Sequence, residues 1–199
     1  QQRYDLFRKE YRLPPSTLLL LYQGWFAPIR NLATLIKGLA YLDERYHLIM
    51  MGYGSYANEL EKLAQVCKVA DRVIFVPAKS QGELLYYTAS ADIGVIPYTK
   101  DANLNNFYSS PNKLYEYIAA GLPVLANRLP YCEEFIKRFH NGLVADLNTP
   151  EAFARAVQKI CAQDIEKLRR QSLEAYYALN WDREAAKLRA LYQDLETMG

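Results

Sequence analysis

Short apolar runs alternate with stretches of helical spacing along most of this 199-residue chain. The first run, Leu18–Tyr22, is continuous, as expected of a strand buried on both faces. The remaining predicted strands are His47–Met51, Val73–Val76, Ile93–Ile96, Val124–Ala126 and Gly142–Ala145. Strands that alternate with helices at this spacing favour βαβ units with right-handed crossovers. The sequence therefore predicts an α/β fold, a Rossmann-like parallel sheet of about six strands with helices on both faces.

The chain divides into three predicted segments. Residues 1–15 are rich in charge and end in Pro14-Pro15, so we expect a linker or interdomain segment there. Residues 16–180 hold every predicted strand and form the predicted Rossmann-like domain. Residues 181–199 form a predicted C-terminal helix whose apolar stripe consists of Leu188, Leu191, Tyr192 and Leu195.

Composition narrows the class of protein. Hydrophobic residues make up 51% of the sequence, which is enough for a sizeable core. The net charge of +2 is too small to indicate a nucleic-acid partner. No apolar run approaches the roughly 18–20 residues of a membrane span, and no signal peptide is visible. The chain opens without an initiator Met, so we expect a fragment of a longer protein.

The cysteines and histidines do not form a recognisable reactive group. Cys67, Cys132 and Cys161 are odd in number and widely spaced in apolar patterns, which indicates free buried thiols and a reducing compartment. No Cys or His pair has ligand spacing, so we predict no metal site. No order of Ser, His and Asp suggests a hydrolase triad.

A loop, a helix, a sharp stop and a strand follow one another in the stretch 108–124. We predict Ser110 as the N-cap and Pro111 as the first helical residue, where its missing N–H costs nothing. Gly121 should end the helix, and Pro123 prevents its resumption.

The start of this helix suits an anion. Its free N–H groups and positive dipole end attract a phosphate, and Lys113 adds a full charge. Glu116 lies three residues later, on the same helix face. This arrangement predicts a nucleotide site, with a diphosphate at the helix tip and the ribose hydroxyls on the carboxylate.

Five loops follow predicted strands and should meet at one edge of the sheet, because parallel sheets bind ligands beyond the carboxyl ends of their strands. These loops are 24–31, 52–56, 77–80, 97–113 and 127–134. Gly52-x-Gly54-x-x-Ala57 also matches a dinucleotide fingerprint. Because it follows the second strand rather than the first, we interpret it as a tight turn.

The order of these features resembles the C-terminal, nucleotide-binding lobe of retaining glycosyltransferases of the GT-B fold, from about Leu18 to Leu195. The block from Pro111 to Val124 carries the resemblance most specifically, and it is similar to the variant found in bacterial surface-polysaccharide enzymes (group 1, family 4 type). The other motifs are Tyr22-Gln23-Gly24 with Arg30, Gly52-Tyr53-Gly54 with Glu59-Leu60, Asp71 to Phe75, Leu85 to Tyr87 with Ala91-Asp92, Pro97, Glu133-Glu134 and Asn141 to Val144.

The resemblance implies a role for each matched residue. Glu116 would bind the ribose of the donor, while Arg30 and Lys113 grip the diphosphate; these three side chains are the expected catalytic set. The other expected donor-binding residues are Gly24, which lets the backbone approach the phosphates, Ser110 and Asn112 at the distal phosphate, Val76 and Pro77 (with the backbone through Lys79) at the base, and Tyr108 at the sugar.

Two residues depart from the family pattern. Tyr108 stands where the first glutamate of an E-x7-E motif is expected, so the usual acid at the donor sugar is absent or replaced from the loop that holds Asp101, Asn103, Asn105 and Asn106. Trp25 stands where an arginine is frequent, which leaves Arg30 and Lys113 to hold the diphosphate.

The implied function is donor binding for glycosyl transfer. The substrate would be a nucleoside-diphosphate sugar, with no cofactor, and a saccharide or lipid-linked acceptor would bind through a separate N-terminal lobe. Such enzymes are cytoplasmic, many of them bound peripherally at the inner face of the membrane. Two alternatives stay open: a sugar-nucleotide epimerase of the same fold, and a catalytically degenerate nucleotide-sugar-binding or assembly module.

Overall fold

The computed structural model describes residues 4–99 and 104–197, with side chains through residue 193. Its six strands form one sheet in the order β3-β2-β1-β4-β5-β6, and every neighbouring pair is parallel. The predicted fold class is confirmed. The strands are β1 (Leu18–Trp25), β2 (Tyr46–Tyr53), β3 (Val73–Pro77), β4 (Ile93–Ile96), β5 (Val124–Ala126) and β6 (Gly142–Val144).

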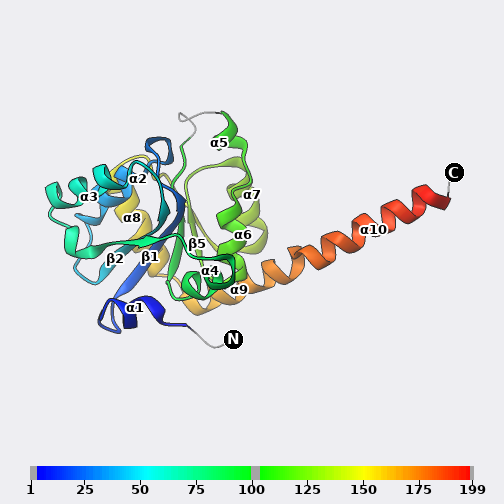
Figure 1. The fold of residues 1–199 in the computed structure, drawn as a ribbon, viewed down its shortest axis with the longest axis horizontal. Helices are drawn as coiled ribbons and strands as arrows, with labels where there is room; N and C mark the ends of the chain where they lie inside the picture. The colour runs from blue at the N-terminus through cyan, green and yellow to red at the C-terminus, as the bar shows by residue number, and fades with distance from the viewer. Residues whose placement is uncertain (1–3, 100–103, 198–199) are drawn as a thin grey trace.

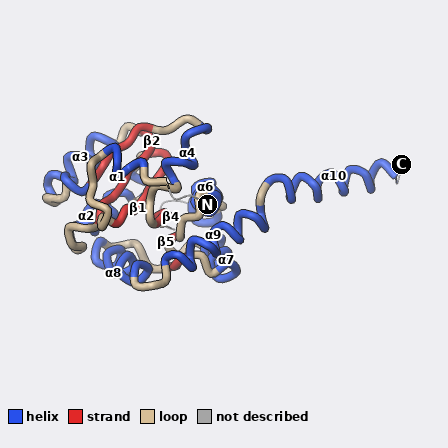
Figure 2. The backbone as a smooth tube through the Cα atoms, turned by 90° about the horizontal axis from the view of Figure 1, so that it is seen from below, coloured by secondary structure: helices blue, strands red, loops and turns tan. Residues whose placement is uncertain are grey.

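Helices cover both faces of the sheet (Figures 1 and 2). On one face lie α2 (Leu32–Leu39), α3 (Ala57–Val66) and α8 (Pro150–Cys161), of which α2 contacts the other two. On the opposite face lie α4 (Gln81–Thr88), α6 (Asn112–Ala119) and α7 (Pro130–Phe139), with α9 (Ile165–Leu179) packed on α6 and α7. The remaining elements are α1 (Leu6–Glu10), the 3-10 turns η1 (Pro28–Arg30) and η2 (Ala70–Arg72), α5 (Leu104–Tyr108) and α10 (Trp181–Thr197).

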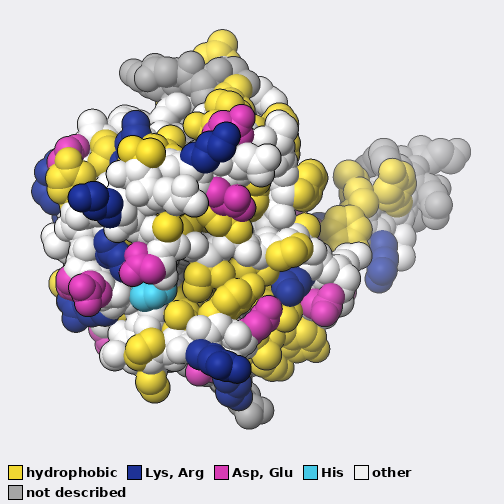
Figure 3. Space-filling view, turned by 60° about the vertical axis from the view of Figure 1, so that its left-hand side comes forward, with side chains coloured by type: hydrophobic (Ala, Val, Ile, Leu, Met, Phe, Trp, Pro, Cys, Tyr) yellow, Lys and Arg dark blue, Asp and Glu magenta, His cyan; other side chains and the backbone are white. Residues whose placement is uncertain are grey.

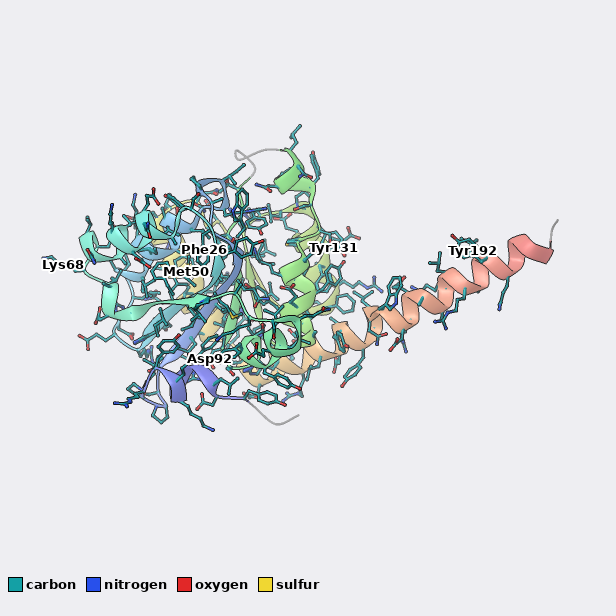
Figure 4. The ribbon with its side chains drawn as sticks, in the orientation of Figure 1. Phe26, Met50, Lys68, Asp92, Tyr131 and Tyr192 are labelled. Carbon is teal, nitrogen blue, oxygen red and sulfur yellow. The ribbon has the colours of Figure 1, made fainter. Side chains whose placement is uncertain are left out.

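The core lies where the apolar runs cross the sheet. Leu19, Leu20, Leu21 and Tyr22 are completely buried, because helices cover β1 on both faces. Figure 4 shows Phe26 and Met50 in this interior, beside β1 and β2. Because side chains on both faces of β1 are buried, its sequence is continuously apolar rather than alternating between apolar and polar residues.

Two strands run further than the sequence predicts. β1 continues through Gly24 to Trp25, and β2 continues through Gly52 to Tyr53, where loops were expected. The two glycines pair in register, and a Cβ on Gly52 would lie 1.9 Å from the carbonyl oxygen of Gly24. The missing side chain therefore lets the two strands stay paired to the edge where the ligand loops begin.

The N-terminal segment contains α1, which packs at the amino ends of β1 and β4. Phe7 is fully buried, and the guanidinium of Arg8 pairs with the buried carboxylate of Asp92 and donates to the carbonyl oxygen of Thr17. Asp92 also accepts from the backbone N–H of Leu19, and Figure 4 shows it beside α1. The predicted linker therefore contains a helix that packs on the domain.

Part of the predicted loop 97–113 is helical. The helix α5 spans Leu104–Tyr108, so the loop prediction was wrong there, while Asp101 and Asn103 lie outside the described residues. The free cysteines are confirmed, although full burial holds for Cys132 alone, since Cys67 and Cys161 are half-buried. Burial raises the pKa of the Cys132 thiol to about 12, which keeps it protonated and unreactive.

The last helix, α10, extends away from the domain (Figure 1). Leu188, Leu191 and Tyr192 are exposed on it, and Figure 4 shows Tyr192 well away from the sheet. Among the described residues, no helix has the length and apolar character that crossing a bilayer requires. Acidic and basic side chains are interspersed on the face seen in Figure 3.

Candidate functional site

The candidate site lies where the chain reverses its order across the sheet. Strands β1 and β4 are neighbours, and the connections that follow them lead to opposite sides, which opens a crevice at their carboxyl ends. A cavity of about 460 Å³ occupies this position. Its walls are Gln23, Gly24, Trp25, Arg30, Tyr53, Tyr98, Asn105, Asn106, Ser109, Ser110, Pro111, Asn112, Lys113 and Glu116.

A second cavity, of about 180 Å³, adjoins the first. The two share Gln23, Gly24, Tyr53 and Glu116, and the smaller one is otherwise lined by Met51, Gly52, Ala78, Lys79 and Leu84. Glu116 therefore lies at the boundary between a larger polar compartment and a smaller one beside the end of β3.

The helix α6 sets the position of Lys113 and Glu116. Contrary to prediction, its N-cap is Pro111, whose carbonyl oxygen accepts from the N–H of Leu114, and Ser110 makes no capping hydrogen bond. The hydroxyl of Ser110 donates instead to Tyr115 Oη at 3.2 Å. The helix begins one residue later than expected because Pro111 has an extended ψ of 128°.

The other end of α6 is as predicted. Gly121 has a φ of +68°, its N–H donates to the carbonyl oxygen of Ile118, and the N–H of Leu122 donates to that of Tyr117. These two bonds form a Schellman motif, which needs a residue with positive φ. The stop at Gly121 lets the chain enter β5 directly, so α6 keeps its N-terminus at the crevice.

Lys113 is buried in the wall of the larger cavity, and its side chain is only 6% exposed. Its Nζ atom donates to Tyr98 Oη and lies 4.3 Å from the ring centroid of Tyr22. Burial, with a further contribution from the charge of Arg30, lowers the pKa of Lys113 to about 7, and Glu116 opposes this shift.

Arg30 supplies a second cation from the η1 turn. Its Nη1 donates to Asn106 Oδ1 at 2.8 Å, and its guanidinium lies 4.4 Å from the ring centroid of Tyr98. Its Nε atom is buried without a hydrogen-bond partner among the described residues. A buried donor without a partner is costly, so this atom is available to an anionic ligand in the cavity.

Glu116 is oriented by a short hydrogen-bond chain. Gln23 Nε2 donates to Glu116 Oε2, and the hydroxyl of the fully buried Thr88 donates to Gln23 Oε1 at 2.9 Å. Because an ionised carboxylate only accepts, the Nε2 end of the Gln23 amide must face Glu116, and its Oε1 end then faces Thr88. One carboxylate oxygen is held by the protein, which leaves the other for a ligand hydroxyl.

The backbone at Gly24 approaches the cation closely. Its φ is +126°, which a residue with a side chain rarely adopts, and a Cβ there would lie 3.5 Å from Lys113 Nζ. The absence of a side chain at Gly24 therefore leaves space in the cavity next to Lys113 Nζ.

Most of the predicted site residues meet in this crevice. Gly24, Arg30, Ser110, Asn112, Lys113 and Glu116 all line the larger cavity. Val76 is buried in β3 and Pro77 ends that strand, and neither lines the larger or the smaller of these two cavities; Ala78 and Lys79 line the smaller one. Tyr108 is 67% exposed at the end of α5, where it packs edge-to-face on Phe107 rather than entering the cavity.

Sequence reasoning did not assign site roles to Gln23, Tyr98 or Thr88. A polar residue at the end of the apolar run 18–22 was a usable signal for Gln23. Tyr98 follows β4 at the carboxyl edge, yet nothing in its neighbours marks it as a partner of Lys113. The described residues contain no group of three His, Cys, Asp or Glu side chains placed to hold a metal ion.

Chemically, the crevice offers a dianion two basic side chains and the N–H groups of a helix N-terminus, and it offers neighbouring hydroxyls the second carboxylate oxygen of Glu116. These groups lie at the switch point of a parallel, Rossmann-like sheet, which is where sheets of this kind bind their ligands. Sequence comparison gives the family: residues 4–177 match the glycosyl transferases group 1, and the chain belongs to that family.

Individual relatives agree with this assignment. The chain is 26% identical over 196 residues to a D-inositol 3-phosphate glycosyltransferase of Xylanimonas cellulosilytica, covering 93% of this chain and 44% of the relative. It is 30% identical over 190 residues to a GDP-mannose-dependent alpha-(1-6)-phosphatidylinositol monomannoside mannosyltransferase of Mycobacterium tuberculosis, covering 91% and 48%. The chain thus spans less than half the length of these curated relatives.

A solved structure shows the same fold. Sucrose-phosphate synthase from Thermosynechococcus elongatus superimposes with a TM-score of 0.81 at 25% identity, covering 98% of this chain and 50% of that one. The sheet order and the matched length identify a GT-B-like C-terminal lobe.

Proposed function

We propose that this chain is the donor-binding lobe of a retaining glycosyltransferase and that it binds a nucleoside-diphosphate sugar. The observation that carries the proposal is the position of Glu116 at the boundary of two adjoining cavities. Arg30 and Lys113 lie in the larger cavity, which suits a diphosphate, and the smaller cavity beside β3 suits a base. A ribose would join the two at Glu116.

These side chains would also act during transfer. As the bond between the sugar and the diphosphate breaks, negative charge grows on the departing phosphate oxygen. Lys113, Arg30 and Asn112, the first residue of α6, all line the cavity where that oxygen would lie. Because these donors need little reorganisation, they stabilise the leaving group and lower the barrier.

The acceptor belongs to the part of the enzyme outside this chain. Relatives of about twice this length support a separate N-terminal lobe, which would hold a saccharide or lipid-linked acceptor. The exposed residues Leu188, Leu191 and Tyr192 on α10 form an apolar surface suited to that lobe. We propose action at the cytoplasmic face of the cell membrane, since one relative is named for a phosphatidylinositol-based acceptor, which is a membrane lipid.

Calorimetry with UDP, GDP, ADP and CDP tests donor binding by this chain. We expect one of them to bind, and Glu116→Ala to weaken it by about 1.5–3 kcal/mol through loss of the ribose contact. The matched control is Glu61→Ala, at an exposed residue of α3, which should leave the affinity unchanged. A 2′,3′-dideoxy form of the same nucleotide should bind equally to the unsubstituted chain and to the Glu116→Ala variant; an undiminished effect of the substitution would disprove the ribose contact.

A degenerate binding module is the second candidate, favoured by Tyr108. Within the described residues, Glu116 is the one carboxylate that lines either cavity, and Tyr108 faces solvent where the family motif has an acid. Transfer assays on the full-length enzyme separate the two candidates: nucleotide binding without transfer to any acceptor would support the module.

A further inference from the structure

Lys113 is buried more deeply than a lysine with no acidic partner should be. Its side chain is 6% exposed, and no ion pair joins it to a carboxylate within the described residues. Instead, its nitrogen lies between two tyrosines, 4.3 Å from the ring centroid of Tyr22 and 4.5 Å from that of Tyr98. An isolated buried ammonium is costly, so such a group tends to lose its proton.

Tyr98 is shared by both cations of the cavity. The guanidinium of Arg30 lies 4.4 Å from its ring centroid, and Lys113 donates to its hydroxyl. An aromatic ring attracts a cation over its face, and a hydroxyl can accept from either an amine or an ammonium. Tyr98 therefore contacts both basic groups, and within the described residues neither of them forms an ion pair with a carboxylate.

The groups that face Lys113 come from four elements. They are Tyr22 from β1, Tyr98 from the segment after β4, Arg30 from η1 and Glu116 from α6 itself. Both tyrosines have a raised pKa because they are buried, so neither supplies a negative charge near neutral pH. The carboxylate of Glu116 is already bonded to Gln23.

We propose that burial beside Arg30 keeps Lys113 a neutral amine in the ligand-free chain, that Tyr98 is a positioning residue which fixes its Nζ atom at the cavity, and that Lys113 takes up one proton when the diphosphate binds. This inference rests on the proposed function and deepens it. The proton comes from the buffer and forms a new N–H bond on Nζ, and the ammonium then pairs with a phosphate oxygen. Tyr98 keeps its own proton throughout.

The rise in the pKa of Lys113 on binding determines how many protons are taken up and how steeply the Kd depends on pH. With the pKa of Lys113 at about 7 in the ligand-free chain, about nine-tenths of the side chains are neutral at pH 8.0. A bound diphosphate, an opposite charge in direct contact, raises that pKa again. Binding at pH 8.0 should then take up about 0.9 proton, and the Kd should rise about eightfold from pH 7.5 to pH 8.5.

Calorimetry in two buffers of different ionisation enthalpy measures the proton count directly. The probes are UDP, GDP, ADP and CDP at pH 8.0, where the terminal phosphate is fully ionised and does not itself take up protons. We expect an uptake near 0.9 for the chain and near zero for Lys113→Met. Binding with no uptake, or equal uptake in Lys113→Met, would overturn the inference while the proposed function stands. Failure of all four nucleotides to bind would overturn both.

Two substitutions test the role of Tyr98. Tyr98→Phe keeps the ring and loses the hydroxyl, so its Kd should rise severalfold at pH 8.0 and change little at pH 6.0, where Lys113 is already charged. Tyr98→Leu removes the ring as well and should weaken binding at least tenfold at both pH values. The control is Tyr46→Phe, a buried tyrosine at the opposite end of β2. A Tyr98→Phe chain with the pH profile of the unsubstituted chain would refute the positioning role.

Discussion

Replacing Lys113 by Met should stabilise the ligand-free chain, and by an amount that depends on pH. In the unfolded chain the lysine stays protonated up to its ordinary pKa of 10.5, whereas burial lowers the pKa to about 7 in the folded chain. Between these values the unfolded state binds more protons, so this residue makes the folded chain more stable as the pH rises. The gain from pH 7 to pH 9 is about 2 kcal/mol.

Lys113→Met lacks this titration and keeps a similar apolar volume. Its advantage over the unsubstituted chain should therefore be largest at pH 6–7 and smaller by about 2 kcal/mol at pH 9. Urea unfolding followed by far-ultraviolet circular dichroism at each pH measures the difference, and Lys62→Met, at an exposed residue of α3, is the matched control. A difference that stays constant from pH 6 to pH 9 would show that Lys113 is an ammonium throughout, which refutes the reasoning.

Two further substitutions test the packing that positions the site. Gly94→Ala places a Cβ 2.4 Å from the ring of Tyr117, between β4 and α6, and should lower the free energy of unfolding by about 1–3 kcal/mol in a urea titration; an unchanged midpoint would contradict that contact. Arg8→Met leaves the buried carboxylate of Asp92 without its guanidinium and should cost about 3–5 kcal/mol, measured the same way. Adding Asp92→Leu should recover much of that loss, and no recovery would mean that Arg8 acts through something other than the pair.

The fold followed from the sequence where burial leaves a local signal. Ile93–Ile96 and Val124–Ala126 were predicted with the bounds that the structure has, since both strands are buried along their whole length. The errors fall where the signal is not local. The ends of β1 and β2 depend on Gly24 and Gly52 lying opposite each other, which is a tertiary pairing. The short helix α5 lies among asparagines that favour a loop.

The site could be predicted from the sequence only in part. Lys113 and Glu116 share one helix, so their spacing alone places them on one face. Gln23 lies 93 positions from Glu116, so no local sequence pattern predicts the hydrogen bond between their side chains. Ser110 was expected to cap α6, but Pro111 occupies that position. The predicted roles of Val76, Pro77 and Tyr108 at the donor stay predictions.

The residues that the resemblance to GT-B lobes assigns to the diphosphate and the ribose lie together in the crevice between β1 and β4. The family supplied the expectation of a donor site, and the structure adds what holds it together: Thr88 and Gln23 behind the carboxylate, and Tyr98 between the cations. These partners come from elements far apart in the sequence. The proposal of a donor site can therefore be tested by observing where a nucleotide binds relative to these residues.

A crystal structure of the chain soaked with the tightest-binding nucleoside diphosphate gives the strictest test of that site. We expect the diphosphate at the N-terminus of α6 within contact of Lys113 and Arg30, the ribose hydroxyls on Glu116, and the base beside Ala78 at the end of β3. A nucleotide bound elsewhere, or one with its phosphates away from Lys113 and its ribose away from Glu116, would contradict the proposed donor site.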